Sequence, residues 1–103
     1  MSATVLTLVT PAEAGKALAG RVRTLRLLRG WTRETLARRA GVSAASLKRF
    51  ENNGKASLDL VLKVAHALAR LEEFNGMFRP PPAASIAELE RQLQRPARKR
   101  GRI

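Results

Sequence analysis

The stretch Thr32–Asn53, TRETLARRAGVSAASLKRFENN, decides the fold because it predicts two short helices joined by a tight turn. Thr32 and Ser43 are suited to start the two helices, since a hydroxyl oxygen can accept a hydrogen bond from an unpaired amide of the first turn. Gly41 lies between them, where a sharp exit requires a left-handed backbone. We therefore expect a helix–turn–helix whose second helix, residues 44–52, is free to enter a DNA major groove.

Side chains of this stretch divide between two sides of the expected helix pair. The apolar ones recur at helical spacing and predict a wedge shared by both helices: Leu36, Ala37, Ala40, Val42, Leu47 and Phe50. Four others are left on the outer side of the second helix: Ala44, Ala45, Lys48 and Arg49. The outer side is therefore the surface on which a ligand is expected.

These motifs resemble the XRE/Cro repressor family of helix–turn–helix regulators. The residues that carry the resemblance are Thr32–Ala37, Gly41–Ser43, Leu47, Glu51–Gly54 and the following helix, Ser57–Leu68. The resemblance spans roughly residues 22–68 and implies an all-α, lambda-repressor-like domain of five helices. It also implies that an arginine of the first helix pairs with the glutamate at the end of the recognition helix, here Arg26 with Glu51. An ordinary solvated arginine is the alternative for Arg26.

Many members of that family carry Gln where this chain has Arg33, and polar residues where it has Ala44 and Ala45. The base-reading pattern therefore cannot be copied from the family. From side-chain chemistry, we expect Arg49 and Lys48 to reach guanine edges, and the two alanines to offer methyl contacts. The residues expected to contact phosphates are Arg33, Arg38, Ser43, Ser46 and Lys55.

Charge is concentrated where the motif lies. The chain of 103 residues carries a formal net charge of +12 and no cysteine. Residues 16–55 hold eleven basic and two acidic side chains, whereas residues 56–94 have a net charge of −1 and the tail from Arg95 adds +5. This distribution favours a nucleic-acid binder over a surface that is basic only for solubility. We expect no disulfide, no membrane span and no signal peptide, and hence a cytoplasmic protein.

Two further helices are predicted around the motif. Thr10, Pro11 and Glu13 form a start signal for a helix that runs to about Arg29. Its expected apolar stripe is Leu18, Val22, Leu25 and Leu28, with Arg21, Arg23 and Arg29 solvated. Ser57 is expected to cap a helix whose core-facing residues are Leu58, Val61, Leu62, Ala65 and Leu68.

The two ends of the chain are predicted to be appendages of a domain at residues 11–78. Residues 1–10 form either a short strand or an extended arm, residues 79–94 a proline linker and a short helix capped by Ser85, and residues 95–103 a basic disordered tail. A compact apolar set is expected to form a homodimer contact, with packing inside the chain as the alternative for Phe74: Leu71, Phe74, Met77 and Phe78.

The expected function is sequence-specific binding of an inverted-repeat operator in double-stranded DNA. Within the family, residues 74–90 and the basic stretch that follows are similar to HipB-like antitoxins, which implies a HipA-type kinase toxin as partner. A free-standing phage-type repressor and an interaction module with only non-specific nucleic-acid binding are the alternatives. An enzyme is not expected, because the chain has one isolated histidine and no phosphate loop. We expect no cofactor, metal ligand or catalytic residue.

Overall fold

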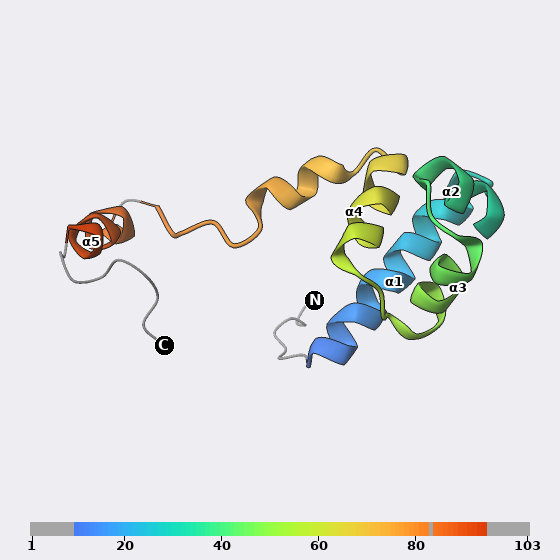
Figure 1. The fold of residues 1–103 in the computed structure, drawn as a ribbon, viewed down its shortest axis with the longest axis horizontal. Coiled ribbons are helices and arrows are strands. Elements are labelled where there is room, and N and C mark those ends of the chain that lie inside the picture. Colours follow the sequence, from blue (N-terminus) through green and yellow to red (C-terminus); the bar gives the residue numbers. More distant parts are fainter. Residues whose placement is uncertain (1–9, 83, 95–103) are drawn as a thin grey trace. The chain divides into compact units, whose positions relative to one another are not determined.

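The computed structural model describes residues 10–82 and 84–94 (Figure 1). The expectations for residues 1–9, an arm or a strand, and for the basic tail 95–103 lie outside these residues. Residue contacts divide the chain after Glu73, whereas the sequence placed the end of the domain at residue 78. The first unit therefore ends at Glu73, and the second begins at Phe74.

Four α-helices build the first unit, and the described part of the chain contains no strand, which confirms the all-α prediction. They are α1 (Pro11–Leu28), α2 (Arg33–Ala40), α3 (Ala44–Asn53) and α4 (Leu58–Ala67). Each begins directly after the hydroxyl residue that the sequence indicated: Thr10, Thr32, Ser43 and Ser57. Local capping chemistry therefore sets all four starting points.

The turn between α2 and α3 is closed by a left-handed glycine. Gly41 has φ 74° and ψ 32°, a conformation that costs other residues free energy because of their Cβ atom. The amide of the next residue, Val42, donates to the carbonyl oxygen of Ala37 at 3.0 Å. This pattern ends α2 and turns the chain directly into α3.

The core lies where the four helices meet. α1 packs against α3, and α2 packs against both α3 and α4 (Figure 1). The largest fully buried side chains of this core are Phe50, Leu36, Leu47, Leu68 and Val64. Because α3 contributes the central Phe50 and Leu47, its inner face is fixed within the domain by apolar packing.

Some core assignments from the sequence were wrong. Leu28 is 77% exposed and Leu58 is 67% exposed, although both were expected in apolar stripes. α4 buries Leu60 and Val64, which were not expected, while Val61 and Leu62 are only half-buried. Ala65 and the C-cap Leu68 are buried as expected. The helix carries apolar residues on more than one face, so several stripes of helical spacing fit its sequence and only packing selects among them.

The remaining elements are short. A 3₁₀ helix, η2, spans Leu71–Gly76, and helix α5 spans Ala84–Leu93 in the second unit. The predicted cap Ser85 therefore lies inside α5 and does not precede it. No helix in the described ranges is long and apolar enough to cross a bilayer.

Candidate nucleic-acid interface

Helix α3 presents two chemically different faces. Leu47 and Phe50 on the inner face pack into the core and are only 0% and 1% exposed. The opposite face is exposed and carries the two methyl groups, the two cations and one amide of this helix: Ala44, Ala45, Lys48, Arg49 and Asn52. Residues three and four apart lie side by side on a helix, so these side chains form one continuous strip.

A buried ion pair anchors α3 to α1. Arg26 donates from Nε to Oε2 of Glu51 at 2.8 Å and from Nη2 to Oε1 at 2.9 Å. Arg26 is only 6% exposed and the Glu51 side chain only 1%. The third nitrogen of the guanidinium, Nη1, donates to the carbonyl oxygen of Trp31 at 2.9 Å. The two parallel bonds fix both the position and the rotation of α3 relative to α1.

Arg33 joins the same carboxylate from α2. Its Nε donates to Oε1 of Glu51 at 3.0 Å, and its side chain is 35% exposed. Burial by itself raises the pKa of Glu51, but the hydrogen bonds from Arg26 and Arg33, together with their positive charges, outweigh it and hold the pKa below its ordinary value. One ionised carboxylate therefore connects the three helices that surround the recognition surface.

A second group of arginines is engaged with Trp31. The guanidinium carbons of Arg29 and Arg39 lie 5.1 and 4.6 Å from the centre of the indole ring. Arg29 also donates from Nη2 to the carbonyl oxygen of Leu68 at 3.0 Å, at the end of α4. Arg29 was expected to be only solvated, and it is instead part of a contact between helix ends.

Among the exposed cations that make no side-chain hydrogen bond or ion pair within residues 10–82 and 84–94, four belong to α2, α3 and the turn after α3: Arg38, Lys48, Arg49 and Lys55. A hollow of about 460 Å³ is lined by residues of three helices: Arg26 of α1, Thr32, Arg33 and Glu34 at the start of α2, and Ala44 and Lys48 of α3. The helix starts, the hollow and the unpaired cations together form a surface suited to a polyanion.

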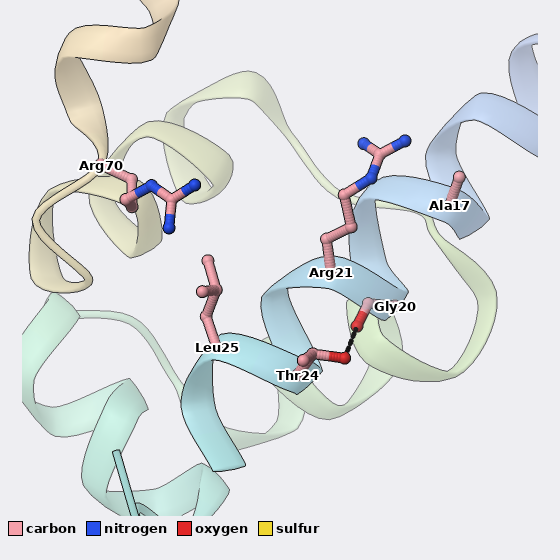
Figure 2. Close-up of a pocket in the computed structure, with 6 residues that line it drawn as sticks. All are labelled: Ala17, Gly20, Arg21, Thr24, Leu25 and Arg70. Carbon is pink, nitrogen blue, oxygen red and sulfur yellow. Dashed lines mark hydrogen bonds between the residues drawn. The ribbon is translucent and has the colours of Figure 1, made fainter. Parts of the chain in front are cut away.

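A different hollow involves α1 and not the recognition strip. Figure 2 shows Arg21 and Leu25 of α1 together with Arg70 around it, and the Thr24 hydroxyl donating to the carbonyl oxygen of Gly20 at 3.0 Å. Arg70 is also paired with Glu73. No residue of α2 or α3 lines this hollow, so it is separate from the recognition strip.

A family model described as helix-turn-helix, of the XRE type, matches residues 22–74, just over half of the chain. The chain belongs to the XRE-type helix-turn-helix family. The fold agrees with the lambda-repressor-like domain expected for this family, with the 3₁₀ helix η2 after the four α-helices. No curated protein matches the chain. Family membership makes it a DNA-binding transcriptional regulator.

In this helix-turn-helix protein, the four expected base-contacting residues all lie exposed on α3: Ala44, Ala45, Lys48 and Arg49. The expected phosphate contacts are less uniform. Ser43 Oγ accepts from the Ser46 amide at 3.0 Å and shares a hydrogen bond of 2.8 Å with the Ser46 hydroxyl. The Nε of Arg33 already donates a hydrogen bond to Glu51. Their contacts with DNA stay predictions.

One residue of the strip was missed from the sequence. Asn52 is exposed and lies four residues after Lys48, so it belongs to the same face of α3. Helical spacing alone was a sufficient signal for it. An asparagine amide can form a bidentate pair with adenine, which adds a third hydrogen-bonding side chain to the strip, beside Lys48 and Arg49.

The expected dimer residues carry considerable exposed apolar surface in the single chain. Leu71 is 39% exposed, Met77 53% and Phe78 97%, whereas Phe74 is half-buried. Phe78 also has a positive φ of 59°, which is uncommon for a bulky residue. Whether these residues form a dimer contact stays a prediction.

Proposed function

We propose that this regulator is a homodimeric repressor that reads an operator with the outer face of α3. The observation that carries the proposal is the contrast between the two faces of this helix. Its inner face is anchored by Phe50, Leu47 and Glu51, while Lys48 and Arg49 project from a fixed scaffold. A rigid helix with unpaired donors is what the major groove can accept.

The chemistry of the strip indicates which bases it can distinguish. Arg49 can donate to O6 and N7 of a guanine, and Lys48 can donate to the same edge of a neighbouring one. Asn52 can pair with an adenine. Ala44 and Ala45 offer only methyl groups, which can contact the methyl group of thymine.

Contacts with phosphates would hold the strip in register. Arg38 and Lys55 are exposed cations, and Arg33 has Nη groups with no partner among residues 10–82 and 84–94. The Ser43 and Ser46 hydroxyls lie at the start of α3, where unpaired amides also favour an anion. Such contacts give affinity without sequence preference.

Dimerisation is supported by the exposed apolar residues Leu71, Met77 and Phe78. We expect Phe78→Ser to shift the protein from dimer to monomer in light scattering at micromolar concentration. Leu28→Ser is a matched control, because Leu28 is also highly exposed but lies in α1. Equal masses for the unaltered chain and the Phe78→Ser chain would contradict a dimer contact at this residue.

The operator is tested by selecting bound sequences from a random pool of DNA duplexes. A homodimer predicts an inverted repeat whose half-site centres lie about 34 Å apart, since the two recognition helices must enter successive major grooves. Recovery of sequences without any consensus would overturn the proposal. It would favour an interaction module that binds nucleic acid non-specifically.

A role as the antitoxin of a toxin–antitoxin operon is the finer proposal, and it would have the protein act in the cytoplasm. It is supported by α5, which exposes Leu89 and Leu93 at 42% and 75% and offers an apolar edge to a partner. Co-expression with the product of the adjacent gene tests it. Co-purification of a kinase-like protein, lost on truncation before Ala84, is expected for an antitoxin, whereas a free-standing repressor would purify alone.

A further inference from the structure

Two glycines from distant parts of the chain touch through their backbones. A Cβ atom added to Gly15 in α1 would lie 2.6 Å from the carbonyl oxygen of Gly54, which follows α3. A Cβ atom on Gly54 would lie 2.6 Å from both the carbonyl carbon of Gly15 and the amide nitrogen of Lys16. No side chain fits at these distances, so both positions require glycine.

The contact places two lysines near each other. Lys16 and Lys55 directly follow the two glycines, and backbone bond lengths put their Cα atoms within about 10 Å. Both side chains are exposed, and neither has an ion-pair partner in residues 10–82 and 84–94. Two lysine side chains that start this close together can both reach one anion, and an anion bound by both would offset the repulsion between their charges.

We propose that Lys16 and Lys55 form a phosphate-binding pair on the DNA backbone beside the groove entered by α3, and that Gly15 and Gly54 are its positioning residues. The inference rests on the proposed function, because it assumes that DNA is the ligand. It extends the interface to the first turns of α1, a helix that contributes no residue to the base-reading strip.

The turn after α3 is thereby fixed at a second point. Glu51 attaches the last turn of α3 to Arg26 of α1, and the glycine contact attaches the next residues to the beginning of α1. Lys55 is thus held in register with Arg49 by two contacts to the same helix. A phosphate contact at Lys55 therefore has a defined position relative to the bases.

The pair is tested by the salt dependence of DNA binding. The full chain is titrated with a duplex selected from the random pool, from 50 to 200 mM salt. For Lys16→Gln we expect the slope of log affinity against log salt to decrease by about 0.9, the value for one lost phosphate contact, and likewise for Lys55→Gln. Lys63→Gln is the control, because Lys63 of α4 is paired with Asp59, and it should leave the slope unchanged.

A wild-type slope in Lys16→Gln alone would overturn the pair and leave the proposed function intact. Failure of the unaltered chain to bind any duplex would overturn both. The two failures are therefore distinguishable in one set of titrations.

The role of the glycines is tested by Gly15→Ala with Gly20→Ala as its match. Both lie in α1, but a Cβ atom at Gly20 would meet nothing within 4 Å. We expect Gly15→Ala to melt at a lower temperature than Gly20→Ala. Its slope of log affinity against log salt should decrease by about as much as in the two lysine variants combined. Identical melting temperatures and slopes for the two alanine variants would overturn the positioning role.

Discussion

Arg26 and Arg49 are the same residue type in opposite surroundings. Arg26 is buried, and its three nitrogen atoms donate to Glu51 and to the carbonyl oxygen of Trp31. Arg49 is exposed, and no residue in the described part of the chain pairs with it. The first stabilises the fold, and the second is left for a ligand.

The difference shows that net charge overstates the charge available to DNA. Residues 16–55 have a net charge of +9, but four of their arginines are engaged within the protein. Arg26 and Arg33 bind Glu51, while Arg29 and Arg39 lie against Trp31. The engaged arginines should contribute mainly to stability and the unpaired cations to affinity. Arg33 should contribute to both, because only its Nε is hydrogen-bonded to Glu51.

Removing the charge of Glu51 should have the largest effect. Glu51→Gln leaves the Arg26 guanidinium buried without a counter-charge, and we expect the free energy of unfolding to fall by about 3–5 kcal/mol. Chemical denaturation monitored by helical circular dichroism measures it. Glu34→Gln on the exposed side of α2 is the control and should change stability by under about 0.5 kcal/mol. Equal effects would mean that the pair does not anchor α3.

Acid should remove part of the same stabilisation. The folded pKa of Glu51 lies below its ordinary value of 4.5, so the stability gained from ionisation is fully present above about pH 4.5. It is lost as the pH falls from there through the lowered folded pKa. Denaturation midpoints measured from pH 7 to pH 3 should therefore decline less in Glu51→Gln than in the unaltered chain. An equal decline of the midpoints in both proteins would mean that Glu51 is not the source of this pH dependence.

The smallest effect is expected at the neighbouring pair Arg38 and Arg39. Arg39→Gln removes a cation from the Trp31 ring and should lower stability by about 0.5–1 kcal/mol, with a change in tryptophan fluorescence. Arg38→Gln should leave stability unchanged and reduce affinity for all DNA sequences alike. Exchange of these two outcomes would break the distinction between engaged and unpaired arginines.

Much of this architecture could be predicted because local chemistry sets it. The hydroxyl caps fix the four helix starts, and Gly41 supplies the left-handed turn that the motif requires. The exposed face of α3 followed from helical spacing alone. The Arg26–Glu51 pair came from family resemblance and not from spacing, since 25 residues separate the two partners.

Other contacts between distant segments could not be predicted from the sequence. The core face of α4 depends on which of its apolar stripes meets α2, and Trp31 binds arginines from both sides of it in the chain. Ala69 adopts a left-handed φ of 62° after α4, where the sequence provides no glycine as a signal. The Gly15–Gly54 contact joins helix α1 to a turn, and only the three-dimensional structure shows it.

The central claim, that the outer face of α3 reads bases, is tested most directly by Arg49→Ala. Its affinity is measured for the selected operator and for a scrambled duplex of the same composition and length. We predict a loss of about 1–3 kcal/mol on the operator, little loss on the scrambled duplex, and relaxed selection at one position of each half-site. Equal losses on both duplexes would show that Arg49 contacts only the backbone and would contradict the claim.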